Sequence, residues 1–453
     1  MISEVLVAPI PCPDAWPLVR LKHIARKIGS GATPTGGQAA YQHTRSRFAL
    51  VRSQNVFDRS FREAGLAFIS DVQAEGLRNV QLEEGDLLLN ITGDGVTFGR
   101  ACAVPAKVLP ACVNQHVSII RVDTDSADPG YLLSYLTHPT VKEYVESFNA
   151  GGSRRAITKA HIESFVVPLP PLGTQRTIAR LLSALDDRIA LLRETNATLE
   201  AIAQALFKSW FVDFDPVRAK QQGLAPAGMD EATATLFPDG FDESALGLVP
   251  RAWETAKLGA EASYLNRGIS PKYVDVGGVL VVNQKCVRDF KIDLSKARRH
   301  NDGQRGIDGR ELRVGDVLVN STGVGTLGRV AQVLTLDEPT IVDSHVTVVR
   351  AGDRFSWNYL GLAMMRRQAE ISELGEGTTG QTELNRGKLA GLVFVVPPRE
   401  VLEAFDESTL PLRMRLAANS RQAQTLATLR DTLLPRLISG QLRLPEAELE
   451  AMA

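Results

Sequence analysis

The chain contains two copies of one long pattern, and this repeat limits the folds that it can adopt. GDLLLNITGDGVTFGR at 85–100 recurs as GDVLVNSTGVGTLGR at 315–329. Three further pairs occur in the same order in both halves. NQHVSIIR at 114–121 recurs as DSHVTVVR at 343–350, and FVVPLPP at 165–171 recurs as LVFVVPP at 392–398. Upstream, Trp16 and Leu21 have counterparts in Trp253 and Leu258. The repeat is about half the chain, far longer than a solenoid unit of about 20–50 residues. A duplicated domain is therefore predicted, with each copy followed by a helix.

Within each copy, short apolar runs between turn signals predict strands. DLLLNIT and DVLVNST lie between Gly-Asp and Thr-Gly pairs, and SIIRV and VTVVR are rich in β-branched residues. Short helices are expected at 131–148 and 357–374. The predicted fold class is α+β, with two similar globular domains of about 150 residues and mixed or antiparallel sheets.

Two long helices are predicted after the Pro-Pro pairs, each with a narrow apolar seam. When Asn196 and Ala203 are counted in the first helix and Asn419 and Ala423 in the second, the seam residues follow one another in steps of mostly four and three. This spacing is typical of a coiled coil and not of the wider stripe of a globular helix. A 35-residue helix would be roughly 50 Å long at ~1.5 Å per residue. The predicted seam consists of Ile178, Leu182, Leu185, Ile189, Leu192, Leu199 and Leu206 in the first helix and Leu412, Leu416, Leu426 and Leu433 in the second.

A narrow seam needs a partner of the same kind, and the simplest partner is the other helix of this chain. Antiparallel pairing would place the domains at opposite ends of a rod with approximate two-fold symmetry. Each seam contains an asparagine, Asn196 or Asn419, which either fixes the register or lies in a solvated slot. Pro411 is expected to kink the second helix or to mark its start.

These features divide the chain at residues where composition changes. We expect a first globular domain at 1–171, a central helix at 172–212, an acidic connector at 213–250, a second globular domain at 251–398, and a C-terminal helix and tail at 399–453. The net charge is −1. Basic residues outnumber acidic ones by 17 to 15 in 14–171 and by 20 to 17 in 251–398, whereas 213–250 has 2 against 7. Charge alone gives only weak support for an anionic partner.

Composition predicts a cytoplasmic protein without a metal site. The four cysteines, at 12, 102, 112 and 286, show no CxxC spacing, so reduced thiols are expected. The N-terminal residues lack a basic region followed by a long apolar run, so no secretory signal is predicted. No apolar run approaches the ~20 residues that span a bilayer, so no membrane partner is expected.

The motifs that suggest catalysis have simpler explanations. GVGTLG at 323–328 formally matches GxGxxG, but its sister copy is one residue longer and a strand-like RVAQVL follows it, which favours a β-turn. His116 and His345 occupy matching positions, and we expect structural histidines within strands. GxSxG, HExxH, the phosphate-binding GxxxxGK[ST] and the methyltransferase motif [ND]PP[YF] are all absent from the sequence. No catalytic residue is therefore predicted.

The chain resembles the specificity subunits of type I restriction–modification systems. The resemblance covers about residues 14–443. It rests on the Trp-Pro-x-x-x-Leu opening at Trp16, the GDxLxNxTG segments, the Pro-Pro followed by TQRTIARLLSALDDRIALL, and LRDTLLPRLISGQL at 429–442. It implies a non-catalytic subunit whose two domains each read half of a split, asymmetric sequence in double-stranded DNA.

The resemblance also implies partners and cofactors outside this chain. The two helices would set the spacing of the half-sites and dock two methyltransferase subunits, which use S-adenosylmethionine. Restriction subunits that use ATP and Mg would join them, and this chain itself would hold no cofactor.

The candidate DNA contacts are polar residues in basic loops. Arginine reads guanine and Gln or Asn reads adenine through paired hydrogen bonds, whereas loop Lys and Arg more often touch phosphate. Gln54 and Gln284 are taken as matching positions. For each residue a solvated surface charge is an equal alternative. The candidates are Arg45, Arg47, Arg52, Gln54, Asn55, Arg154, Arg155 and Lys159 in the first domain and Arg267, Lys272, Gln284, Lys285, Arg298 and Arg299 in the second.

Two other functions remain as alternatives. One is a coiled-coil scaffold with two peptide-binding or assembly domains, which the near-neutral charge permits. The other is a nucleotide-dependent oxidoreductase that uses GVGTLG, and this one predicts a co-purifying nicotinamide or flavin.

Overall fold

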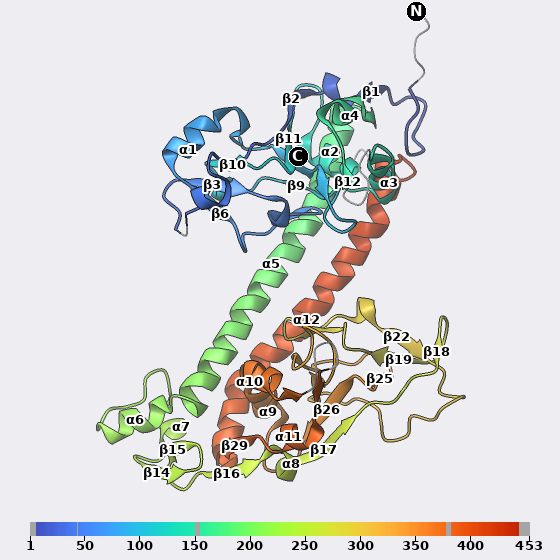
Figure 1. Ribbon diagram of the computed structural model, residues 1–453. Helices are drawn as coiled ribbons and strands as arrows, with labels where there is room; N and C mark the ends of the chain where they lie inside the picture. Colours follow the sequence, from blue (N-terminus) through green and yellow to red (C-terminus); the bar gives the residue numbers. More distant parts are fainter. Residues whose placement is uncertain (1–5, 43, 150–154, 377–381, 444–453) are drawn as a thin grey trace, which may run out of the picture. The chain divides into compact units, whose positions relative to one another are not determined.

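The computed structural model describes residues 6–42, 44–149, 155–376 and 382–443. The chain forms two compact units, each described by itself below. The first consists of Met1–Leu191 and Gln422–Ala453, and the second of Leu192–Arg421. Each unit therefore combines one copy of the repeat with part of each long helix (Figure 1). In the described residues, no helix is both long enough and apolar enough to cross a bilayer.

The first unit contains a four-stranded antiparallel sheet and a three-stranded mixed sheet. The central strands contain buried β-branched residues such as Val117, Ile119 and Ile120, which favour strands, and the buried leucines 87–89. In spatial order the sheets are β2 (Ala25–Ser30), β11 (Val117–Val122), β7 (Leu87–Asn90) and β9 (Ala101–Ala103); and β10 (Ala111–Val113), β3 (Phe48–Val51) and β6 (Ala67–Ile69). Among the described strand pairs of these two sheets, β10–β3 alone is parallel.

The second unit repeats both sheets and adds an edge strand. Its sheets are β17 (Ala262–Arg267), β26 (Val346–Ala351), β23 (Val317–Asn320) and β24 (Val330–Gln332); and β18 (Tyr273–Val274), β22 (Arg298–His300), β19 (Val279–Val282) and β25 (Thr340–Val342). β19 and β25 are parallel, as β3 and β10 are. β18 has no counterpart among the described strands of the first three-stranded sheet (Figure 1). The predicted α+β class with mixed and antiparallel sheets is confirmed.

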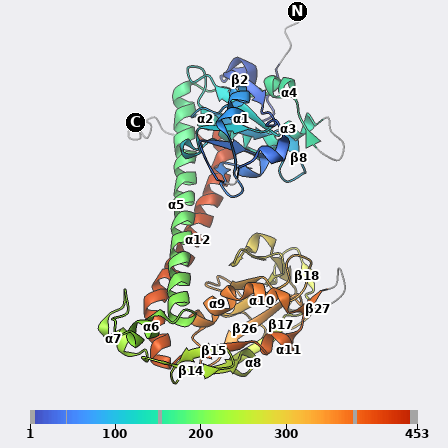
Figure 2. The same cartoon turned by 60° about the vertical axis from the view of Figure 1, so that its left-hand side comes forward.

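Short helices and two-stranded ribbons complete the units. In the first unit they are α1 (Asp71–Gly76), α2 (Pro129–Leu136), α3 (Pro139–Ser147), α4 (Lys159–Ser164), β1 (Leu18–Arg20) with β13 (Val166–Pro168), β4 (Val56–Phe57) with β5 (Ser60–Phe61), and β8 (Thr92–Gly93) with β12 (Arg155–Ala156). In the second they are α8 (Leu258–Glu261), α9 (Trp357–Arg366), α10 (Gln368–Glu373), α11 (Arg386–Ala390), β16 (Glu254–Lys257) with β29 (Val393–Val396), β20 (Val287–Arg288) with β21 (Lys291–Ile292), and β27 (Gly375–Glu376) with β28 (Glu383–Leu384). In Figure 2, α9 lies beside β26, and it packs on the sheet that contains this strand.

The single helices expected at 131–148 and 357–374 are each divided in two. Pro139 cannot donate a helical hydrogen bond, and the chain starts the new helix α3 with His138 as its cap. In the second unit the break falls at Arg367, between α9 and α10.

The same polar contacts recur in both copies and show that the repeat is structural. In each, an arginine of the central strand binds a fully buried aspartate: Arg121 Nε meets Asp86 Oδ1 at 2.8 Å, and Arg350 Nε meets Asp316 Oδ1 at 2.7 Å. These charge-assisted bonds raise the pKa of both arginines against the opposing effect of burial.

Two 40-residue helices begin directly after the Pro-Pro pairs: α5 (Leu172–Phe211) and α12 (Arg399–Ile438). They pair antiparallel, since in the second unit Asn196 meets Asn419, whereas Phe207, further along α5, packs on the earlier Phe405 of α12. In the first unit Asp186 of α5 binds Arg430 of α12.

The predicted seam residues are buried to differing extents, and their pairing across the two helices stays a prediction. Ile178, Leu182, Ile189, Leu192 and Leu416 are buried. The others, Leu185, Leu199, Leu206, Leu412, Leu426 and Leu433, are half-buried.

Pro411 does not mark the start of the second long helix. It lies inside α12, which already begins at Arg399. Of the two expected outcomes, a helix start at Pro411 was therefore wrong, whereas a kink at this residue stays a prediction. Packing of Val401, Leu402 and Phe405 into the core explains why the helix extends upstream of it.

The acidic connector is folded. It forms α6 (Asp215–Gln221), α7 (Glu231–Thr235) and a hairpin of β14 (Phe241–Ser244) and β15 (Gly247–Pro250). Phe214, Val217 and Phe237 are buried in the core of the second unit, and the Phe237 ring meets Trp210 edge-on at 5.2 Å. These scattered apolar side chains anchor a segment whose composition indicated only a linker.

Candidate nucleic-acid interface

The GVGTLG segment forms a turn, as expected. Gly323, Gly325 and Gly328 have positive φ values, and at Gly323 an added Cβ would lie 2.3 Å from Thr326 Oγ1. The strand β24 follows in the chain, in place of the helix whose N-terminus would bind a phosphate in a dinucleotide fingerprint. The segment therefore shapes a loop of the repeat and does not form a dinucleotide site.

Beside this turn, each copy holds a threonine–histidine pair. Thr92 Oγ1 lies 2.6 Å from His116 Nδ1, and Thr322 Oγ1 lies 2.7 Å from His345 Nδ1. Both histidines lie in the turns that precede β11 and β26, so the expectation that they lie within strands was wrong. The reason is that Asn114 and Asp343 each accept a hydrogen bond from the histidine N–H two residues later and thereby form a turn.

The structure also corrects the alignment of the two candidate DNA-contact loops, 52–55 and 283–285, which are called the reading loops below. Asn90 Nδ2 donates to the carbonyl oxygen of Ser53 at 3.0 Å, and the matching Asn320 Nδ2 donates to that of Gln284 at 2.9 Å. Ser53 and Gln284 are therefore equivalent, and Gln54 corresponds to Lys285. The sequence comparison was one residue out of register because both loops contain a single glutamine.

In the second unit, candidate DNA contacts gather around a cavity of about 330 Å³. The extra strand β18 contributes Tyr273, and the guanidinium of Arg298 on β22 lies 3.5 Å from the centre of the tyrosine ring. The cavity is lined by Tyr273, Asn283, Gln284, Lys285, Lys296, Arg298, Asp343 and His345. Three basic residues against one acidic residue make this wall suitable for an anionic ligand.

Asp343 is the buried acidic group of this cavity. Its side chain is 3% exposed, and burial raises its pKa, although the hydrogen bond from the His345 backbone N–H at 2.9 Å opposes the shift. The sequence reasoning missed Tyr273, Lys296 and Asp343. Asp343 follows directly after a β-branched strand, where a polar residue more often makes a turn.

The reading loop of the first unit is braced by its own side chains. Asn55 is fully buried and donates to the Arg62 carbonyl at 2.9 Å, which places it in the support of the loop. Arg45 donates to the carbonyls of Val108 and Leu109, both at 3.0 Å. Arg52 and Gln54 both donate to the Gly65 carbonyl.

The remaining candidates lie at the surface, mostly in ion pairs. Arg47 is exposed beside the Phe48 ring, and Lys272 is exposed with no ion pair recorded among the described residues. Arg154 lies outside the described residues. The other pairs are Arg155 with Glu146, Lys159 with Glu163, Arg267 with Glu383, and Arg299 with Glu338 through two 2.9 Å hydrogen bonds.

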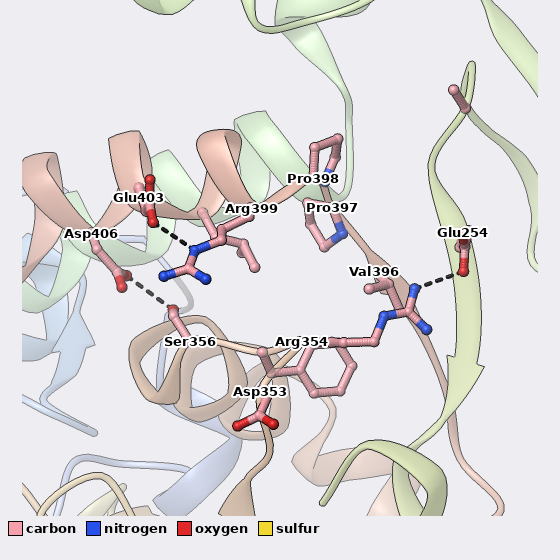
Figure 3. Close-up of a pocket in the computed structure, with 13 residues that line it drawn as sticks. Glu254, Asp353, Arg354, Ser356, Val396, Pro397, Pro398, Arg399, Glu403 and Asp406 are labelled. Carbon is pink, nitrogen blue, oxygen red and sulfur yellow. Dashed lines mark hydrogen bonds and ion pairs between the residues drawn. The ribbon is translucent and has the colours of Figure 1, made fainter.

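A larger cavity of about 690 Å³ in the second unit has the opposite charge (Figure 3). It lies where α12 begins, and its rim carries the ion pairs Arg354–Glu254 and Arg399–Glu403. With Asp353 and Asp406 added, four acidic residues face two arginines. By volume this cavity would be the first candidate for a binding site, but its excess of acidic residues does not suit the phosphate backbone of a nucleic acid.

The comparisons with known proteins all find similarity to one class of protein. A family model described as "Type I restriction modification DNA specificity domain" matches residues 60–201. The chain is 24% identical over 434 residues to the type I restriction enzyme HindI specificity subunit of Haemophilus influenzae, covering 87% of this chain and 94% of that protein. It is 24% identical over 345 residues to the MjaIX specificity subunit of Methanocaldococcus jannaschii, covering 74% of each. In fold it matches a type I restriction–modification S subunit from M. genitalium with a TM-score of 0.60, at 11% identity, over 95% of this chain and 99% of that one.

Proposed function

Because this chain is related over most of its length to the specificity subunits of type I restriction–modification systems, we propose that it reads the DNA target for such a complex. The relationship confirms the resemblance that the repeat and its motifs predicted. The observation that carries the proposal is the basic cavity of the second unit, where Gln284, Lys285 and Arg298 meet at the reading loop. Amide and guanidinium groups of this kind hydrogen-bond to base edges in the major groove.

Each globular domain would bind one half of a split DNA sequence. The loop residues at equivalent positions differ, since Ser53 corresponds to Gln284 and Gln54 to Lys285. Different side chains at equivalent places present different donors and acceptors, so the two half-sites should differ. The full target would then be asymmetric.

The chemistry would belong to partner subunits. Two methyltransferase subunits that use S-adenosylmethionine would dock on this chain, and restriction subunits that use ATP and Mg would complete the assembly. This chain would contribute recognition, and through α5 and α12 the spacing between half-sites. Adding one helical turn to both helices should lengthen the spacer in the target and leave both half-sites unchanged.

The test is a map of methylated adenines across the genome, in cells with this gene intact and deleted. We expect a split, asymmetric motif that disappears on deletion. A complementary measurement uses the complex purified with its methyltransferase subunits. If it binds all DNA sequences equally at moderate salt, the proposal is wrong, because electrostatic attraction alone produces unspecific binding.

A further inference from the structure

We infer that Asp343 determines the sequence preference of the second domain, by accepting a hydrogen bond from the exocyclic amino group of an adenine or cytosine in its half-site. The inference rests on the proposed function, because it requires that this domain reads DNA. It goes further by assigning one residue and one chemical group on the base.

The first support is the unused acceptor of a buried carboxylate. Asp343 is 3% exposed, and its Oδ1 accepts from the His345 backbone N–H at 2.9 Å. Within the described part of the chain, no group donates to Oδ2, and the residue lines the open cavity. Because Asp343 lines this cavity, its second carboxylate oxygen is available to a donor that enters the cavity. The exposed edges of adenine and cytosine carry such a donor, the exocyclic amino group.

The second support is that donors surround this acceptor. Gln284 Oε1 already accepts from Thr322 Oγ1 at 3.2 Å, which leaves its Nε2 group as the donor. Lys285 and Lys296 supply positive charge for backbone phosphates. Asp343 is the single acidic residue among those that line the cavity, so it provides the acceptor that amino-group recognition requires.

The third support comes from the first unit, where an amide occupies the same place. Asn114 is also buried, and its Oδ1 accepts from the His116 N–H at 3.2 Å, as Asp343 does from His345. An amide carries both a donor and an acceptor, whereas a carboxylate only accepts. The two domains therefore differ in hydrogen-bonding character at one matched position. Asp343→Asn is also a mild change, because Asn114 already makes the same turn in this chain.

The experiment uses the complex with its methyltransferase subunits and duplexes that carry the mapped target. At each adenine or cytosine of either half-site, the amino group is removed by substituting purine or 2-pyrimidinone. We expect the wild-type complex to lose about tenfold or more in affinity at one position of the second half-site, the size of a good base contact. For Asp343→Asn, removal of the same amino group should lower the affinity by less than about threefold. The base at that position in the mapped target shows whether adenine or cytosine is read.

Two controls make the result decisive. Asn114→Asp should alter preference in the first half-site only, and Asp343→Asn should leave every first half-site preference unchanged, which shows that the variant is folded. If the wild type is specific but Asp343→Asn keeps every preference, the inference is overturned and the proposed function stands. If the wild type shows no sequence preference, the proposed function itself has failed.

Discussion

Asn419 of α12 donates its side-chain amide to Oδ1 of Asn196 on α5 at 3.0 Å. Asn196 in turn donates to the Leu416 carbonyl at 3.1 Å and to Ser420 Oγ at 2.9 Å. Both asparagines are buried, at 4% and 3% exposure. The sequence left open whether these residues fix the register or lie in a solvated slot. The contacts favour the register, because only one alignment of the helices satisfies both amides.

Replacing one asparagine of this pair should destabilise the protein more than replacing both. Asn419→Leu leaves the Oδ1 of Asn196 buried without its donor, at a cost of about 1–3 kcal/mol. Asn196→Leu together with Asn419→Leu should recover part of that loss. Urea unfolding of the full chain measures both effects, with exposed Gln422→Leu on α12 as the control. Strict additivity of the two single changes would show that the side chains do not interact.

Asp186 should be essential to the pairing of the helices in the first unit. Its two oxygens bind Arg59 Nε at 2.6 Å and Arg430 Nη1 at 2.8 Å, and the Arg59 side chain is only 6% exposed. Asp186→Asn would leave the buried Arg59 guanidinium without a counter-charge, at a cost on the order of 3 kcal/mol, whereas Arg430 would keep its ion pair with Asp431. Thermal and urea unfolding measure the loss. The exposed neighbour change Asp187→Asn should have little effect, and equal stabilities of the two variants would contradict the prediction.

Asp406 should make the stability of the second unit depend on pH. Burial raises its pKa above the ordinary 3.8, although Asn358 and Ser356 donate to its Oδ1. For an acid whose pKa is raised by folding, the folded state favours the protonated form. That stability is present below the unfolded pKa and is lost as pH rises through the folded pKa.

Asp406→Asn removes this titration. The wild type should therefore lose stability relative to the variant as pH rises from below 3.8 through the raised pKa of Asp406. Urea titrations at several pH values measure the difference, with exposed Asp353→Asn from the same cavity as the control. A difference between wild type and Asp406→Asn that is constant across this range would show that Asp406 is not the titrating group.

Lys285 and Lys296 should contribute to DNA affinity through phosphate and not through base identity. Both line the basic cavity. Removing both by substitution to alanine should weaken binding to all sequences by a similar factor. It should also lower the slope of log affinity against log salt by about 2. Filter binding at several salt concentrations checks this, and a changed target sequence with an unchanged slope would assign them to base reading instead.

The sequence predicted the features that depend on chain-long patterns. The repeat, the starts of α5 and α12 after the Pro-Pro pairs, and the turn at GVGTLG all follow from periodicity and turn chemistry. Features that depend on tertiary contacts were missed. The folded connector rests on a few buried aromatic residues such as Phe237, and the cavity depends on the two-residue strand β18. Neither leaves a periodic signal.

The sequence named candidate DNA contacts one by one, and their role in DNA binding stays a prediction. It did not predict that Gln284, Lys285 and Arg298 line one cavity, that Asn55 is buried, or that Arg45 binds backbone carbonyls. A single sequence does not distinguish an arginine that supports a loop from one that faces a ligand. The one-residue error between Gln54 and Gln284 has the same origin, since only the contacts of Asn90 and Asn320 fix the alignment.

The asparagine pair has a consequence for how such a chain evolves. After an insertion in α5 alone, between Asn196 and Phe207, the chain cannot keep both the contact of Asn196 with Asn419 and the packing of Phe207 on Phe405. Descendants with longer helices therefore cannot arise by gradual growth of one helix. They require compensating events in two distant parts of the gene, such as recombination between its similar halves. Helix length should thus change among descendants in abrupt, coordinated steps, while the surface loops drift freely.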